Sequence, residues 1–546
     1  MSSLKMSDNS ISSSAFKTKL LTKTGFFKNM HFGMSVTAIA LVSAFVFFIA
    51  IFHDSAASIF GDARSWIEHH FGLYYLITAE VLIALCFFII VSPYGKIRFG
   101  HDHEKPEFGY FAWLSMLFSA GIGTGILFFG VGEPSFYFDN SGFAGYPNNP
   151  FADMIGATAM DQDRAVQALQ VSFLHWGVHG WAIYAVVGMS LAYFAYRKNL
   201  PLAMRSTLHP FIGDRIYGPI GHTVDLITVM VCIFSVASAL GLGVSQISVG
   251  IEHLFGIEAT TFSKLALISL ISLIAIASAI SGVSRGIKMI SRWNTILSIS
   301  IVILFLLAGP TTWIINLFSD TLISYLENFI QMGLWVADEP GPAKWQSSWT
   351  IFYWGWWFAW SPFIGLFIAR ISRGRTLREF VVGTLFIPTV LIFIWLGVFG
   401  GSAIHEEINS TAGVGTAGII DLIKEWKIPH ALFANTDIIF GHGSLAWIIS
   451  AIMVILLICL FITSADSSVL VLTTVLSFGN NEPPKFFRAF WGVMIALISA
   501  ILLIAGGLNV LQTTNIAAAL PVSILLIMMS LALLKAIVWD ERITSK

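Results

Sequence analysis

Apolar runs follow one another along almost the whole chain, separated by shorter polar stretches. A run of roughly 20 residues is long enough for a helix to cross a bilayer. In chain order, such runs cover residues 34–53, 73–93, 110–138, 167–196, 222–251, 263–282, 292–309, 349–370, 380–401, 443–477, 487–506 and 511–536. The pattern predicts an all-α polytopic membrane protein with twelve transmembrane helices.

The basic residues indicate the orientation of these helices. With the N-terminus inside, most of the 30 Lys and Arg residues fall in the two tails and in the cytoplasmic loops. The exceptions, on the outer side, are Arg64, Arg164, Lys264, Lys344, Lys424 and Lys427. Because loops rich in Lys and Arg stay in the cytoplasm, we predict cytoplasmic tails at 1–33 and 537–546. The protein is then a multi-pass protein of the plasma membrane, which is the inner membrane in bacteria.

The composition narrows the classes of function. Hydrophobic residues make up 56% of the 546 residues and charged residues 11%, whereas a soluble domain averages about 25% charged residues. A phosphate loop of the G-x-x-x-x-G-K-[ST] type does not occur in the sequence, so an ATP motor of that type is excluded. A secondary transporter, a channel, a membrane-embedded enzyme and a receptor remain, and we expect no nucleic-acid partner.

Two of the apolar runs contain residues that interrupt helices. The third run has Gly121, Gly123 and Gly125 within five residues, and each glycine costs about 1 kcal/mol relative to alanine in a helix. We expect the helix to unwind there, although such glycines also allow helices to pack closely. The eighth run contains Pro362, at which we expect a second break. These two helices lie five apart with opposite directions, as in an inverted repeat that binds its substrate at mid-membrane.

Aromatic residues gather at the same depth in two of the predicted helices. One face of the eighth helix carries Trp349, Tyr353, Trp356, Trp357 and Trp360, and the fourth helix carries Trp176, Trp181 and Tyr184. The aromatic belt at the membrane surface explains Trp349 but not the deeper Trp356, Trp357 and Trp360, and the rings of the fourth helix lie at a similar depth. Ring faces can surround a quaternary ammonium group, each contributing about 0.5–2 kcal/mol. Because a trimethylammonium head offers no N–H donors, ring faces can replace its water without hydrogen bonds, and the pattern favours a box for such a head. We find no acidic partner for these rings.

Other polar residues inside the apolar runs receive structural interpretations. His175 and His179 have the spacing of a helical metal site, but we see no nearby carboxylate or cysteine to complete one. We therefore expect no metal ion other than sodium and no organic cofactor. Glu80, in the second run, is expected to take part in packing or in a subunit contact.

These segments resemble the betaine/choline/carnitine transporter family from about residue 30 to 536. The most specific segment is "WTIFYWGWWFAWSPFIGLFIARISRGRTLREF" at 349–380, and the glycine motif, "HWGVHGWAIY" and "FITSADSS" agree with it. The resemblance implies a LeuT-like core of ten helices, as in sodium-coupled amino-acid transporters, and a homotrimer within membrane lipid. The implied divisions are two peripheral helices at 34–109, a first repeat at 110–309, an extracellular amphipathic helix and loop at 310–348, and a second repeat at 349–536.

Positions within the family motifs imply roles for single residues. The substrate box would consist of Trp176, Trp181, Tyr184 and Trp357, and the neighbouring pathway of Phe352, Trp356 and Trp360. Sodium would bind the hydroxyls of Thr463 and Ser464 and backbone carbonyls near Ser119, Ile122 and Leu460. Alternatively, the two hydroxyls bond back to their own helix, which is common. Arg370 and Asp466 are expected at an inner gate.

Gly125 bears on the substrate and on the coupling ion. Proton-coupled choline carriers of this family have an aspartate at the matching position. Glycine implies that no fixed negative charge lies beside the box, which favours a zwitterion over choline and sodium over protons. Doubly sodium-coupled relatives have threonines where we align Cys232 and Val236, so the stoichiometry stays open.

These observations predict a secondary transporter that imports a quaternary-ammonium compatible solute for osmoprotection. The favoured substrate is glycine betaine, taken up by sodium symport through alternating access. The alternatives are a proton-coupled choline symporter, a carnitine/betaine exchanger, and a receptor that binds the osmolyte without transport. A channel would need a continuous polar pore, and the sequence contains no catalytic constellation that would indicate an enzyme.

Overall fold

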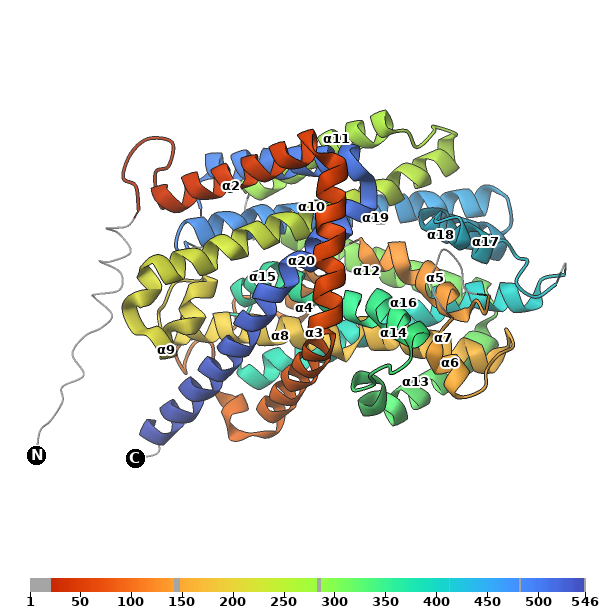
Figure 1. The fold of residues 1–546 in the computed structure, drawn as a ribbon, viewed down its shortest axis with the longest axis horizontal. Coiled ribbons are helices and arrows are strands. Elements are labelled where there is room, and N and C mark those ends of the chain that lie inside the picture. The colour runs from red at the N-terminus through yellow and green to blue at the C-terminus, as the bar shows by residue number, and fades with distance from the viewer. Residues whose placement is uncertain are drawn as a thin grey trace, which may run out of the picture.

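The computed structural model describes residues 21–122, 124–141, 148–281, 286–411, 413–480 and 483–544, which form a bundle of helices (Figure 1). The longer helices are α2 (Phe32–Ile51), α3 (His53–Val91), α4 (Tyr110–Ile122), α5 (Gly125–Phe138), α7 (Gln162–Trp176), α8 (Val178–Ala192), α10 (Pro219–Phe255), α11 (Thr261–Ser281), α12 (Gly286–Ala308), α13 (Thr311–Gly333), α15 (Phe352–Arg370), α16 (Leu377–Asn409), α18 (Ile428–Phe440), α19 (Ser444–Leu476) and α20 (Lys485–Thr544). Short helices between them include α6 (Pro150–Met154), α9 (His209–Ile212), α14 (Pro340–Gln346) and α17 (Ile419–Lys424). The predicted all-α class is confirmed.

Eleven stretches of the described chain are long and apolar enough to cross a membrane. The remaining predicted span is the third in chain order, and it is divided between α4 and α5. Its apolar stretch in α4, Tyr110–Ser119, is too short to cross a membrane alone. The last two predicted spans both belong to α20. Phe487, near the start of α20, packs on Phe27, and Lys535, near its end, donates to the carbonyl of Pro210. Both ends of α20 therefore lie at the end of the molecule that carries α9 (Figure 1).

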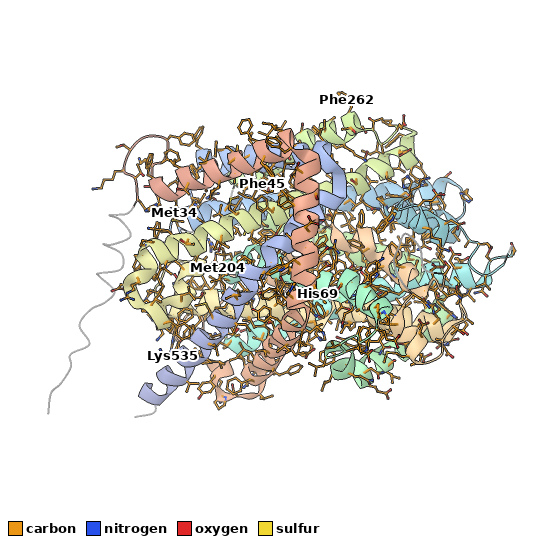
Figure 2. The ribbon with its side chains drawn as sticks, viewed as in Figure 1. Met34, Phe45, His69, Met204, Phe262 and Lys535 are labelled. Atoms are coloured by element: carbon orange, nitrogen blue, oxygen red, sulfur yellow. The ribbon has the colours of Figure 1, made fainter. Side chains whose placement is uncertain are left out.

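The helices differ sharply in how much protein surrounds them. The most apolar stretch of the span that contains α7 and α8 is 100% buried, whereas that of α2 is 28% buried. Apolar side chains such as Phe262, at the outer edge of the molecule in Figure 2, are left exposed. Exposed apolar surface of this extent is expected on helices that face lipid. α7, α8 and α15 therefore form the centre, and α2, α11 and α12 form the periphery.

Pro362 does not break the eighth span, contrary to the prediction. α15 continues through it, although proline has no N–H to donate to the carbonyl four residues earlier, which belongs to Phe358. The hydroxyl of Ser361 donates to that carbonyl at 2.8 Å, and Ser235 of α10 donates to the carbonyl of Ala359 at 3.1 Å. Hydroxyl groups that replace a missing backbone donor allow proline to stay inside a membrane helix.

The fourth span contains a break that the sequence analysis did not predict. Gly177 separates α7 from α8, with φ −92° and ψ −137°. A Cβ atom at this position would lie 2.7 Å from Cζ of Phe393, so the position requires glycine. Beside the break, the backbone carbonyl of His175 accepts a hydrogen bond from Trp357 Nε1 at 2.9 Å. This contact fixes α7 to α15 at the centre of the bundle.

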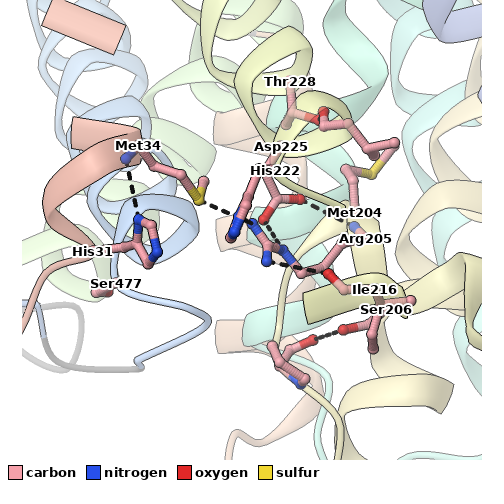
Figure 3. A network of polar contacts seen from close by, with 12 residues as sticks. His31, Met34, Met204, Arg205, Ser206, Ile216, His222, Asp225, Thr228 and Ser477 are labelled. Carbon is pink, nitrogen blue, oxygen red and sulfur yellow. Dashed lines mark hydrogen bonds and ion pairs between the residues drawn. The ribbon is translucent and has the colours of Figure 1, made fainter. Parts of the chain in front are cut away.

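A polar cluster holds the N-terminal segment, residues 21–31, against the bundle (Figure 3). Arg205 and Asp225 are both fully buried, and Arg205 Nε lies 2.6 Å from Asp225 Oδ2. Nη2 of the same guanidinium lies 2.9 Å from Sδ of Met34. The ring of His31 accepts a hydrogen bond from the backbone N–H of Met34 at 3.1 Å and so caps the first turn of α2. The cluster therefore links the N-terminal segment to α2 and α10.

Candidate functional site

A cavity lies at the centre of the bundle, between the broken third span, α7, α8, α10 and α15. Most of its wall is aromatic. It is lined by Gly121, Thr124, Gly125, Phe129, Trp176, Tyr184, Ala239, Leu242, Tyr353, Trp356, Trp357 and Trp360. The cavity thus joins the two helices in which the sequence analysis recognised deep aromatic clusters.

Three of the four predicted box residues line this cavity. The ring centroids of Trp176 and Trp357 are 6.1 Å apart with an interplanar angle of 80°, and those of Tyr184 and Trp357 are 4.7 Å apart. Trp181 is fully buried behind them, with its centroid 6.0 Å from that of Trp357. Trp181 therefore supports the wall without lining the cavity.

The predicted pathway residues divide in the same way. Trp356 and Trp360 line the cavity, whereas Phe352 packs on Trp356 with centroids 5.5 Å apart. The sequence analysis did not assign Thr124 or Tyr353 to the site, although both line the cavity. Tyr353 could have been assigned, because the helical projection already placed it on the face of α15 that carries Trp357.

The glycines of the broken span allow the rings to approach the backbone closely. α4 ends at Ile122 and α5 begins at Gly125, and Gly123 lies outside the described residues. A Cβ at Gly121 would lie 2.9 Å from Cζ3 of Trp181 and closer to Cη2, and one at Gly125 would lie 3.2 Å from Cη2 of Trp176. The interruption therefore brings backbone against the aromatic wall.

A buried carboxylate stands directly behind this wall, contrary to the expectation that the rings have no acidic partner. Glu133 of α5 is fully buried, and its Oε2 accepts hydrogen bonds from Trp176 Nε1 and from the hydroxyl of Tyr353. Its Oε1 lies 3.0 Å from the hydroxyl of Tyr137 and 3.2 Å from Nδ1 of His175. The sequence analysis missed Glu133 because nothing in the sequence of α5 shows that residues of α7 and α15 meet there.

The two histidines of α7 and α8 also have carboxylate neighbours that the sequence did not reveal. His175 contacts Glu133 and, through Nε2, the hydroxyl of Thr350 at 3.1 Å. His179 Nε2 lies 2.8 Å from Glu80 Oε1, which gives Glu80 a packing contact between α3 and α8. Among the described residues, no group of three His, Cys, Asp or Glu side chains could hold a metal ion.

The predicted sodium ligands lie on α4 and α19, which pack against each other. Ile122 is the last residue of α4. The hydroxyl of Thr463 bonds back to the carbonyl of Leu460 at 2.9 Å, as the alternative interpretation expected. The hydroxyls of Ser119 and Ser464 are buried and find no hydrogen-bond partner among the described residues. A sodium site at these residues stays a prediction.

The two predicted gate residues make separate contacts. Arg370, the last residue of α15, places Nη1 3.6 Å from Oε2 of Glu107. Asp466 of α19 accepts a hydrogen bond from the hydroxyl of Ser278 on α11. Both contacts join neighbouring segments, and a gating role for either residue stays a prediction.

Comparison with known proteins agrees with the resemblance that the motifs showed. Residues 34–542 match the family described as BCCT, betaine/carnitine/choline family transporter. The chain is 39% identical to "Glycine betaine transporter OpuD" of Bacillus subtilis (strain 168), over 92% of this chain and 94% of that protein. It is 37% identical to "High-affinity choline transport protein" of Escherichia coli (strain K12), over 92% of this chain and 71% of that protein. It is 34% identical to "Glycine betaine/proline/choline transporter VP1723" of Vibrio parahaemolyticus serotype O3:K6 (strain RIMD 2210633), over 95% of this chain and 91% of that protein. The chain therefore belongs to the betaine/carnitine/choline family of membrane transporters.

Proposed function

We propose that this protein imports a quaternary-ammonium compatible solute, with glycine betaine as the first candidate, by sodium symport through alternating access between two inverted repeats. The observation that carries the proposal is the central cavity. Its wall includes the rings of Trp176, Tyr184, Tyr353 and Trp357, and ring faces bind a trimethylammonium head without hydrogen bonds. Relatives over nearly the whole chain carry the names of glycine betaine and choline transporters.

Trp360 favours glycine betaine in particular. It lines the cavity, and its indole N–H is buried with no hydrogen-bond partner among the described residues. A buried donor without a partner costs about 1–3 kcal/mol. The carboxylate of a zwitterion could accept this hydrogen bond while the cationic head meets the rings.

Choline is the second candidate, because Glu133 is a negative group near the cavity and the sequence analysis had disfavoured choline for the lack of one. The sequence analysis favoured a zwitterion on the ground that Gly125 leaves the box without a negative charge. Glu133 supplies a carboxylate one hydrogen bond behind Trp176 and Tyr353. A bare cation in the cavity would then have a negative group nearby, and the coupling ion could be a proton in that case.

Sodium coupling is supported by buried hydroxyls on α4 and α19, two helices that pack against each other. Sodium needs several oxygen ligands, which hydroxyls and unwound backbone supply in transporters. Ser119 and Ser464 leave their hydroxyls without partners among the described residues, and α4 ends within four residues of Ser119. We place sodium here, with Thr463 joining the site once its bond to Leu460 is released.

We propose that the protein resides in a bacterial inner membrane with both tails in the cytoplasm. We also propose that three copies form a trimer. The outer face of α13 supports the trimer. It exposes apolar residues on an amphipathic helix, among them Ile323, Leu326 and Ile330, each more than half exposed. A second copy or lipid would cover this face.

Radiolabelled uptake by purified protein in liposomes tests the function. We expect glycine betaine to accumulate when an inward sodium gradient is imposed, and Trp357→Ala to raise its apparent Kd by one to two decades, at about 1.4 kcal/mol per decade. Trp357→Phe keeps a ring face and is expected to cost less. Binding without accumulation would indicate a receptor, and accumulation driven by protons in sodium-free buffer would support the choline–proton alternative.

A further inference from the structure

Glu133 accepts hydrogen bonds from two aromatic residues of the cavity wall, Trp176 and Tyr353. Trp176 Nε1 can only donate a hydrogen bond, and it donates to Glu133 Oε2. The hydroxyl of Tyr353 donates to the same oxygen. The two rings come from α7 and α15 and have centroids 5.7 Å apart. One carboxylate oxygen therefore sets the relative position of two rings that are far apart in sequence.

The other oxygen of Glu133 contacts His175, which in turn positions a third ring of the cavity wall, that of Trp357. Oε1 contacts Nδ1 of His175 at 3.2 Å, and the His175 ring stacks on Tyr353 with centroids 4.7 Å apart and an interplanar angle of 14°. The backbone carbonyl of His175 accepts the hydrogen bond from Trp357 Nε1 at 2.9 Å. Trp176, Tyr353 and Trp357 are thus anchored on one group of contacts centred on Glu133.

The anchoring is selective among the tryptophans near the cavity. Trp181 and Trp360 keep buried indole N–H groups without a hydrogen-bond partner in the described part of the chain. The difference follows from position, since Glu133 lies behind Trp176 and Tyr353 only. A carboxylate placed there polarises the N–H and O–H groups that donate to it, which makes the attached rings better acceptors for a cation.

The charge of Glu133 has no fixed cationic partner. Within the described residues its ion-pair partner is His175, and no Lys or Arg side chain pairs with it. Trp176 and Tyr353 donate hydrogen bonds to its Oε2, and Tyr137 and His175 lie within hydrogen-bond distance of its Oε1. A buried charge without a counter-ion is costly, so a cation on the opposite side of the rings would be favoured.

We propose that Glu133 is a positioning and specificity-determining residue: it fixes Trp176 and Tyr353 at the cavity, and its carboxylate strengthens the binding of a net cation more than the binding of a zwitterion. The inference rests on the proposed function, because it concerns the same cavity. It assigns one part of the discrimination between choline and glycine betaine to a carboxylate that does not line the site, while Trp360 acts in favour of the zwitterion.

The test is calorimetric titration of the full-length protein with choline and with glycine betaine, which share the head group and differ in net charge. Glu133→Gln removes the charge, and Glu133→Asp keeps the charge on a side chain too short to reach both rings. Glu407→Gln is the control, since Glu407 is also fully buried but accepts backbone N–H groups of Ala417 and Ile420.

We expect Glu133→Gln to raise the Kd for choline about tenfold more than the Kd for glycine betaine, because one screened ionic attraction is lost for the cation. Glu133→Asp is expected to weaken both ligands while keeping their affinity ratio, and Glu407→Gln to change neither affinity nor ratio. An unchanged ratio in Glu133→Gln would overturn the specificity role, and unchanged affinities in Glu133→Asp would overturn the positioning role.

Two further outcomes are distinguishable from these. If the unmodified protein binds neither ligand, the proposed function fails and this inference fails with it. If Glu133→Gln is not recovered in folded form, adding Tyr353→Phe removes the hydroxyl that would oppose the new amide N–H₂. The same shift in affinity ratio is then required of the double variant.

Discussion

Gly180→Ala tests whether the position of the Trp357 ring determines affinity. Gly180 lies on α8, and a Cβ atom there would come within 2.6 Å of Cζ2 of Trp357 and closer still to Cε2 and Cδ2. The ring is rigid, and its Nε1 is held by the carbonyl of His175 at 2.9 Å, so the ring cannot move away without breaking that bond. We expect overpacking to cost about 1–3 kcal/mol, part of which the gain of about 1 kcal/mol in helix propensity offsets.

The expected effect on binding comes from the ring face alone. A displaced Trp357 loses a cation–π contact with the ligand of about 0.5–2 kcal/mol, whereas its broken hydrogen bond to His175 counts toward stability. The lost contact corresponds to a rise in Kd of roughly two- to thirtyfold, measured by calorimetric titration with glycine betaine. Gly355→Ala is the matched control, because its Cβ would meet Ile516 at an ordinary 3.4 Å. If Gly180→Ala and Gly355→Ala bind equally well, the reasoning about the ring is wrong.

Three other outcomes are expected. Ser464→Ala should weaken the sodium stimulation of uptake about tenfold, whereas Ser467→Ala should not, since the Ser467 hydroxyl already bonds to its own helix; equal sodium curves would remove Ser464 from the ion site. Arg205→Met should lower the free energy of unfolding by about 3–5 kcal/mol, because Asp225 stays buried without its partner, and Arg205→Met with Asp225→Leu should recover most of it in a denaturation series. The pKa of His31 is lowered from its usual 6.5 by burial and by the charge of Arg205, so its contribution to docking of the N-terminal segment is present above pH 6.5 and is lost as the pH falls through the lowered pKa. Proteolysis of that segment, relative to a free peptide, should accelerate on acidification. His31→Asn should weaken the pH dependence and leave the part due to His222 of the same cluster; a pH-independent rate in the unmodified protein contradicts this account.

The sequence was sufficient for the helices, because run length and charge are local properties. It was also sufficient for the rings of Trp176, Tyr184 and Trp357. Trp357 lies on the aromatic face of the eighth helix, and positions within the family motifs implied all three. The predicted break at Pro362 was wrong, since the hydroxyls that satisfy its neighbouring carbonyls come from Ser361 and from another helix.

Glu133 could not have been assigned from the sequence, for a related reason. Its partners Trp176 and Tyr353 lie 43 and 220 positions away, and only the packing of α5, α7 and α15 brings them together. Trp181 also shows that packing decides which residues line the cavity, since the sequence placed it in the box and the structure does not. It shares the motif with Trp176, but the rotation of α8 places it against Gly121 instead of in the cavity.

If the central cavity binds the solute, the break at Gly177 makes part of the ligand specificity a property of the main chain. The carbonyl that positions Trp357 belongs to His175, two residues before the break. Two family members could therefore have the same twelve side chains around the cavity and still select different solutes, if one of them kept a continuous helix at this point. Classifying such carriers by their lining residues alone would miss the difference, and a change of substrate could begin at a glycine that does not line the cavity.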